Sequence, residues 1–397
     1  MPRGWFKRWG VGLAVGILWV LVGAYLVNPS HRWVDGVGLF PVNPVRGFPS
    51  TVSREATLTS GVWWFAGLLV AGLALRIPAR GWRWFQWGAV FAGGGLALTT
   101  LAQRLTPRPF PVYEVTGIFA NENHYAAMIN LLLPCVVTLG IRERMRAFQQ
   151  ATIAGPASLV LLVAGIMVLS IAVTGSRAGM ALATLHVCGC TWLYHRLVGQ
   201  YPFASPPMGA WVVRSLGLIG LGLVGWTVRM VWRDWNGWSF LRGELEFRLG
   251  MIRDGWSIWQ AHFWWGTGPG TYGLVLPYYQ SSMFDGRVIQ HAHFEPVQWL
   301  AEMGLAGTLV LLVAWGCLVV ASPRPKAERT LIPARHELEG AGFLLAWLTL
   351  GLHSLLDFPF RSPWIAMVAA GWLGFGISSV RLALVNRAFE IQSDRTM

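Results

Sequence analysis

The chain has few charged residues. Only 12% of its 397 residues are Asp, Glu, Lys or Arg, whereas a soluble domain carries about 25%. Hydrophobic residues make up 54% of the chain, and the mean hydropathy is +0.48. The apolar runs are long and unbroken, unlike the alternating segments of about 10 residues that form a transmembrane barrel. The composition therefore predicts an all-α polytopic membrane protein.

Cysteine is also scarce, and no C-x-x-C pattern occurs. The cysteines all lie in apolar segments, at Cys135, Cys188, Cys190 and Cys317. This placement indicates neither a disulfide framework nor a zinc site.

Carboxylates in metal-binding patterns are missing as well. The segments expected on the outer side contain no D-x-D pair, and a magnesium-dependent transferase needs carboxylates to hold its ion. The E-x-E of Glu244 and Glu246 is flanked by Arg242 and Arg248, and ion pairing along a helix explains it. We therefore expect no metal and no other cofactor.

Segments long enough to cross a membrane are abundant. A spanning helix needs about 20 mostly apolar residues. Ten segments qualify, over 10–27, 60–76, 84–102, 124–141, 154–174, 178–195, 211–231, 303–321, 340–356 and 363–382. The first resembles a signal peptide, but no small-residue cleavage site is evident before Asn28, so we expect it to remain as a span.

The basic residues predict the orientation of these spans. The net charge of +13 comes from residues that bracket the apolar runs, which is typical of the positive-inside rule and does not indicate a nucleic-acid partner. Ten spans place both termini on one side, and the loops of that side carry 18 of the 31 basic residues. Both termini are therefore expected in the cytoplasm.

This orientation gathers the unusual polar segments on the outer face. They are 116–124, 174–177, 248–302 and 353–361, and a single active site would require them to share one side. We expect one integrated domain in three parts: spans in 1–231, a large outer loop with amphipathic helices in 232–302, and spans with a cytoplasmic tail in 303–397.

Arginines stand out in two of these segments. Arg177 is flanked by Gly175 and Gly179, which allow close approach of a ligand; alternatively, it reaches lipid headgroups. Arg248 and Arg253 lie in the outer loop. A guanidinium is planar, always charged and able to hold phosphate through two hydrogen bonds. Several arginines on one face could hold a pyrophosphate without metal.

An aromatic stretch and a glycine turn follow Arg253. The aromatic residues are Trp256, Trp259, Phe263, Trp264 and Trp265. They fit either an interfacial helix on the outer leaflet or a helix packed on the bundle. The turn Gly266-Thr-Gly-Pro-Gly270 could present backbone N–H groups to phosphate. As a nucleotide loop the signal is weak, since no strand precedes it and no G-K-[ST] follows.

Two histidines, His291 and His293, precede the eighth span. No third metal ligand is evident nearby, and a histidine at a span end is often structural. Beside pyrophosphate-binding arginines, an imidazole could instead act as a general base, oriented by Glu295 or Glu302. Asp357 and Arg361 could pair with each other across a turn or form a wall of the same site.

Five segments, in this order, together resemble the O-antigen ligase / O-antigen polymerase superfamily. They are Gly117-Ile-Phe-Ala-Asn-Glu-Asn-His124, Thr174-Gly-Ser-Arg-Ala-Gly179, Arg248-x4-Arg253-Asp254 with the glycine turn to Gly270, His291-Ala-His293-x5-Trp-Leu-Ala-Glu302, and His353-Ser-Leu-Leu-Asp357-Phe-Pro. The sequence departs from the family pattern at Phe294, Glu295 and Pro296, where the family has Asn, Asp and Tyr.

The resemblance implies a GT-C-like fold and an inverting glycosyltransferase at the periplasmic face of the bacterial inner membrane. It would transfer a glycan from undecaprenyl pyrophosphate to a hydroxyl of a glycan, the lipid A core or a protein, as a ligase or a polymerase. Arg177 and Arg248 would hold the pyrophosphate, and His293 would activate the hydroxyl. Further candidate substrate contacts are Asn123, His124, Arg253, Tyr272, His291, Glu295, Asp357 and Arg361.

A transporter of a small anion such as bicarbonate is the main alternative. A transporter places ionisable residues near the bilayer midplane, often on broken helices in corresponding halves. Here the ionisable residues lie at one interface and no inverted repeat is visible, so the glycosyltransferase is favoured. A structural scaffold is a third interpretation, which a flat surface at this site would favour.

Overall fold

A computed structural model describes residues 3–36, 38–106, 116–150, 155–198, 238–281, 288–321 and 335–394, together with residues 222, 225 and 229. These residues are mostly helical. The α-helices are α1 (Arg3–Val27), α2 (Arg54–Ala74), α3 (Ala79–Leu105), α4 (Glu122–Gln149), α5 (Gly155–Thr174), α6 (Arg177–Val198), α8 (Trp238–Ala261), α9 (Tyr272–Val275), α10 (Glu295–Ala321), α11 (Arg335–Ser354) and α12 (Pro363–Asp394). Two 3₁₀ turns, η2 (Leu276–Tyr278) and η4 (Pro359–Arg361), and an antiparallel hairpin of β1 (His31–Val34) and β2 (Gly38–Pro41) complete the described elements.

The helices confirm the all-α membrane class. All predicted spans except 211–231, which lies almost wholly outside the described residues, overlap a helix. Among the described residues, 6 helices are long and apolar enough to cross a membrane: α1, α2, α4, α5, α10 and α12. α3, α6 and α11 do not reach that hydropathy: α6 and α11 carry charged or histidine residues, and the apolar part of α3 includes Gln86, two threonines and several glycines. The total of ten spans therefore stays a prediction.

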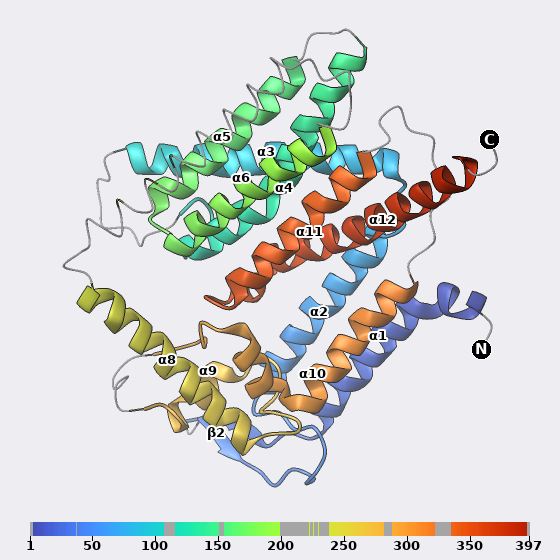
Figure 1. The fold of residues 1–397 in the computed structure, drawn as a ribbon. Helices are drawn as coiled ribbons and strands as arrows, with labels where there is room; N and C mark the ends of the chain where they lie inside the picture. The colour runs from blue at the N-terminus through green and yellow to red at the C-terminus, as the bar shows by residue number, and fades with distance from the viewer. Residues whose placement is uncertain are drawn as a thin grey trace. The chain divides into compact units, whose positions relative to one another are not determined.

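The chain divides into two compact units. Unit 1 comprises Met1–Gly72, Asn236–Ser322 and Ser354–Ala370, and unit 2 comprises the remaining segments. In unit 1, α1, α2 and α10 run side by side, and α8 packs on α10 transverse to their direction (Figure 1). The hairpin, α8, the glycine turn and the 355–361 segment gather at one end of these helices.

Unit 2 is built around α4. Of the residues in its membrane-length segment, 94% are buried, because α3, α5 and α6 pack around it. A buried polar cluster joins α3, α4 and α11. The Arg142 guanidinium donates hydrogen bonds to Glu143, to Glu339 and to the Gln86 side chain, and Glu143 also pairs with Arg83 at 2.9 Å.

Arg142→Ala is expected to destabilise unit 2 strongly. It leaves Glu339 buried without its guanidinium partner, and breaking a buried ion pair costs about 3–5 kcal/mol. The matched control is Arg83→Ala, because the Arg83 side chain is 39% exposed and a surface pair contributes about 1 kcal/mol or less. Thermal unfolding of the purified protein in detergent checks this order. Equal unfolding temperatures for the two variants would contradict it.

Candidate functional site

The polar end of unit 1 is organised by a break in α10. Gly304 has φ 63° and ψ −174°, which is not helical, so the helix is interrupted within a candidate membrane span. A continuous helix would pair the carbonyls of Ala301 and Glu302 with the amides of Leu305 and Ala306. At the break these four groups need other partners, since an unpaired buried backbone group is costly.

The loop after α8 supplies all four partners. The amides of Thr267 and Gly268 donate to the carbonyls of Ala301 and Glu302 at 3.1 and 2.8 Å. In return, the amides of Leu305 and Ala306 each donate at 2.9 Å to the carbonyls of Phe263 and Trp264. The loop at 263–268 is thereby hydrogen-bonded to both halves of α10, and we call this exchange of four bonds the splice.

A tyrosine from α1 completes the junction. The Tyr25 hydroxyl lies 2.7 Å from the Trp265 carbonyl and 3.1 Å from the Met303 carbonyl, one on each side of the splice. A phenol carries one donor hydrogen, so the two carbonyls share it. The end of α1 is thereby tied to both the loop and the broken helix.

Two glycines make this splice possible. Gly266 and Gly304 both adopt positive φ, which other residues rarely do. A Cβ on Gly266 would overlap the Glu302 carbonyl, and a Cβ on Gly304 would overlap the Trp264 carbonyl. Each glycine therefore faces the backbone of the other segment at a distance that no side chain allows.

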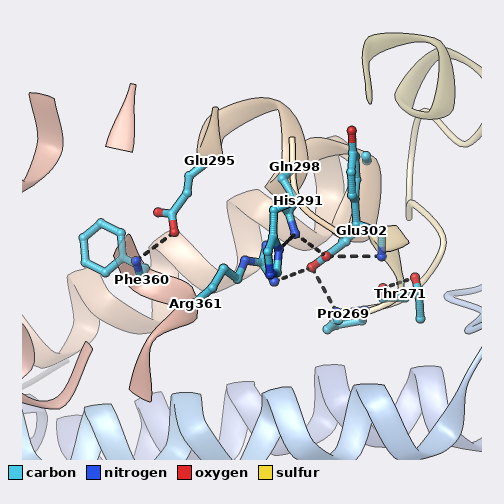
Figure 2. Close-up of polar contacts among 12 residues, drawn as sticks. Pro269, Thr271, His291, Glu295, Gln298, Glu302, Phe360 and Arg361 are labelled. Carbon is cyan, nitrogen blue, oxygen red and sulfur yellow. Dashed lines mark hydrogen bonds and ion pairs between the residues drawn. The ribbon is translucent and has the colours of Figure 1, made fainter. Parts of the chain in front are cut away.

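The Glu302 carboxylate accepts a hydrogen bond from the glycine turn. Its Oε2 accepts hydrogen bonds from the Gly270 amide at 2.9 Å and from Arg361 at 2.8 Å. Its Oε1 accepts one from the Gln298 side chain at 3.1 Å and a longer one from the Tyr272 amide at 3.4 Å. Figure 2 shows these contacts converging on Glu302. The Gly270 amide, one of those that the turn could present to a phosphate, is bonded to this internal carboxylate.

Gln298 links Glu302 to His291. Its side-chain amide contacts His291 Nδ1 at 3.2 Å and accepts a hydrogen bond from the Ala292 amide at 3.1 Å. The His291 ring also stacks on Phe358, with ring centroids 4.1 Å apart. Sequence reasoning missed Gln298, although its spacing of four residues from Glu302 places both on one helix face.

Glu295 anchors the 3₁₀ turn η4. Its Oε1 accepts a hydrogen bond from the Phe360 amide at 2.8 Å (Figure 2), and the residue is buried. Because Arg361 follows directly and pairs with Glu302, two acidic side chains of α10 hold adjacent residues at the end of this short segment. This fixes the position of the neighbouring Asp357.

His293 and Asp357 form a contact at this end. His293 Nδ1 lies 3.1 Å from Asp357 Oδ1, with the carboxylate side chain 1% exposed and the histidine side chain 28% exposed. Phe358 packs edge-on against the His293 ring, with centroids 4.7 Å apart. Since Nδ1 faces the carboxylate, Nε2 is the ring nitrogen left for a ligand.

His293 also has an uncommon backbone conformation. It is the only described residue other than glycine with positive φ, at 50°. Such a conformation costs on the order of 1–3 kcal/mol and persists only where the surroundings impose it. Here the contacts with Asp357 and Phe358 are the surroundings that hold the side chain.

Arg248 reaches the same segment from α8. Its guanidinium donates to the Leu356 carbonyl, the peptide that directly precedes Asp357. Arg253, five residues further along α8, is exposed. Arg248, His293, Asp357 and Arg361 are therefore brought together around residues 356–361.

Tyr272 is buried at the same end of unit 1. Its side chain is buried and its hydroxyl donates to the Met251 carbonyl at 3.3 Å. Burial raises the pKa of the phenol, and the Asp254 and Glu302 carboxylates raise it further, so Tyr272 stays neutral. In this structure Tyr272 is a packing residue between α8 and α10.

The remaining candidates belong to unit 2. Arg177 is the first residue of α6, directly after Ser176, whose hydroxyl accepts a hydrogen bond from the Gly179 amide at 3.1 Å and donates to Asn123 at 2.8 Å. This serine is an N-cap, and it ties the start of α6 to the start of α4. His124 follows Asn123 and is half-buried. The association of these residues with His293 stays a prediction.

The described residues contain no group of three His, Cys, Asp or Glu side chains that could hold a metal ion. Four polar side chains of this end, Glu295, Gln298, Glu302 and Arg361, bond with one another or with backbone amides.

The fold and this polar end define a multi-pass helical membrane protein with a histidine, arginines and carboxylates collected at one end of unit 1. Residues 115–312 match the family model described as O-antigen ligase. The chain belongs to the O-antigen ligase / O-antigen polymerase superfamily. No curated protein matches it. Family membership supports a role in glycan transfer during O-antigen assembly, with a lipid-linked glycan and an acceptor as partners.

Gly304→Ala is expected to disrupt the splice. The new Cβ would overlap the Trp264 carbonyl, and the positive φ is unfavourable for alanine. The matched control is Gly316→Ala in the same helix, where nothing lies within 4 Å of the added Cβ and alanine favours the helix by about 1 kcal/mol. Detergent-solubilised Gly304→Ala should unfold at a clearly lower temperature than the parent, and Gly316→Ala should not. A Gly304→Ala protein as stable as the control would exclude the splice.

Proposed function

We propose that this protein is a metal-independent inverting glycosyltransferase. It transfers a glycan from undecaprenyl pyrophosphate to an acceptor hydroxyl at the periplasmic face of the bacterial inner membrane. The observation that carries the proposal is the contact between His293 and buried Asp357, with Arg248 on the adjoining peptide. It supplies a base and a cation in a chain of the O-antigen ligase family.

In this mechanism, His293 is the general base. The Asp357 carboxylate, 3.1 Å from Nδ1, would favour the ring proton on Nδ1, which leaves Nε2 to take the proton of the acceptor hydroxyl. The hydroxyl oxygen forms a bond with the anomeric carbon of the donor sugar on the face opposite the leaving group. The bond from that carbon to the pyrophosphate oxygen breaks, and its electron pair leaves with the lipid pyrophosphate. Asp357 stabilises the imidazolium that results.

Arginines stabilise the leaving group. The negative charge that develops on the pyrophosphate needs fixed positive charge in a poorly hydrated site. Arg248 supplies one such charge next to the His293–Asp357 pair. The family resemblance assigns Arg177 the same role. Arg253 is exposed on α8 and is proposed as an outer contact for the same anion.

The acceptor is a glycan, the lipid A core or a protein, and the residues after His293 would contribute to its choice. Glu295 stands where the family has Asp, and its carboxylate is bonded to the Phe360 amide. Glu295 therefore shapes the pocket wall through η4 more than through direct contact. His291, stacked on Phe358, forms the neighbouring part of that wall.

His293→Ala is expected to reduce glycan transfer by about 10²–10⁴-fold, the usual loss on removing a general base. Transfer is measured in membrane vesicles with a lipid-linked glycan donor, normalised to folded protein. His262→Ala is the control, because His262 lies at the same end against Tyr279 and has no proposed role in the reaction. A folded His293→Ala enzyme with full activity would overturn the assignment.

Asp357→Asn is expected to lower kcat with little change in KM for donor or acceptor, because the carboxylate acts through His293. Such a pattern is the signature of an interaction that matters in the transition state. Asp254→Asn is the control, since Asp254 is equally buried but bonds to Ser281. If Asp357→Asn and Asp254→Asn lower kcat equally, the effect of Asp357 is merely structural.

A further inference from the structure

α8 carries two apolar stripes on roughly opposite sides. The first is buried: Met251 and Ile258 lie on it, and Ile258 packs with Tyr272, Val275 and Ala301 in the core of this end. This stripe explains how α8 is held in unit 1. The apolar residues on the other side of the helix lie outside this core.

The second stripe is mostly exposed, with two of its six members, Ile252 and Trp259, half-buried. It consists of Leu245, Leu249, Ile252, Trp256, Trp259 and Phe263, at alternating spacings of four and three residues that place them on one face. We call it the outer stripe of α8. Leu245 is 57% exposed, Leu249 50% and Trp256 43%. A row of exposed large apolar side chains of this length marks an interaction surface.

The end of the outer stripe is a connected aromatic surface. The rings of Trp256 and Trp259 meet edge-on with centroids 4.5 Å apart, and Trp259 stacks on Phe263 at 5.0 Å. Trp264, 62% exposed, adjoins Phe263 at 5.1 Å. Trp is enriched at the level where lipid meets water, because its ring is apolar and its N–H needs a polar partner.

The structure fixes the level of this surface relative to the spanning helices. Trp264 and Trp265 belong to the loop spliced into α10, and the Trp265 carbonyl accepts a hydrogen bond from Tyr25, two residues before the end of α1. Both α1 and α10 are candidate spans, and α8 runs transverse to them (Figure 1). The aromatic end of the outer stripe therefore lies at the level where the membrane-spanning part of α1 ends.

We propose that α8 lies along the bilayer surface, with its outer stripe in contact with lipid acyl chains. Exposed Glu246 and Arg253 flank the stripe and would reach the headgroups, as in other interfacial helices. The occupant is bilayer lipid because the stripe leads to exposed apolar residues of α10: the amide of Leu305 donates to the Phe263 carbonyl, and the exposed Leu309 and Leu312 follow about one and two turns further along the candidate span. The same helix carries Arg248, which this placement holds at the depth of lipid phosphates.

A nitroxide scan of α8 tests this placement. Single cysteines at positions 245–260 are introduced into a full-length protein whose four native cysteines are replaced, and the labelled proteins are reconstituted in phosphatidylcholine–phosphatidylglycerol vesicles. Collision rates with oxygen, which concentrates in lipid, and with a water-soluble nickel chelate are then measured. We expect the oxygen-to-nickel ratio to be several-fold higher at 245, 249, 252, 256 and 259 than at Glu246, Arg253 and Gln260. The corresponding depth is about 5–10 Å below the headgroups.

Two results would overturn the proposal. Nickel accessibility at Leu249 and Trp256 equal to that at Gln260 would place the stripe in water. Low accessibility of the stripe to both reagents would mean that protein covers it. The compared positions avoid the buried stripe, so the labels do not disrupt the core. Gly243→Cys gives a further reference position for the collision rates, because nothing lies within 4 Å of the added Cβ. Collision rates do not depend on catalysis, so this experiment tests the placement of α8 independently of the glycosyltransferase proposal.

Discussion

The exchange of four backbone hydrogen bonds between α10 and the loop at 263–268 is the constraint on which the polar end of unit 1 depends. A membrane offers no water to backbone groups, so a break in a spanning helix must be satisfied by the protein itself. The chain meets this requirement by bonding the loop to both sides of Gly304. The first half of α10 is thereby held in the direction that points Glu295, Gln298 and Glu302 toward the loop and η4.

Broken helices are also a feature of transporters, where the freed backbone groups and helix ends bind the solute. The break in α10 is used differently. Its freed amides and carbonyls are bonded to Phe263, Trp264, Thr267 and Gly268, and its nearest carboxylate is bonded to Gly270 and Arg361. The break therefore builds a rigid internal frame, which is what a site that must orient a histidine requires.

Hydropathy and charge patterns predicted the helical class and the overlap of most spans with helices, but they placed the start of the eighth span at 303, whereas α10 begins at Glu295. The error has a physical cause: Glu295, Gln298 and Glu302 lower the local hydropathy, yet each is bonded within the protein. The break at Gly304 could not be predicted, because a glycine in an apolar run is usually a small packing residue. Only the loop that faces it reveals its role.

The same limit applies to the candidate site. Sequence spacing drew attention to His293 and to the acidic residues after it, and it suggested Glu295 or Glu302 as the group that orients the ring. In the structure these two carboxylates bind Phe360 and the glycine turn, and the histidine contact comes from Asp357. A contact between residues so distant in sequence depends on how η4 folds back, which no local pattern encodes.

The three carboxylates explain why a strained histidine is stable here. Glu302 fixes Arg361 and Glu295 fixes the Phe360 amide, so the segment that carries Asp357 and Phe358 cannot shift. Those two residues then hold the His293 ring from two sides. The cost of its left-handed backbone, on the order of 1–3 kcal/mol, is offset by contacts that the frame has already ordered. Through Glu302, the supports of this strained residue are tied to the helix break at Gly304.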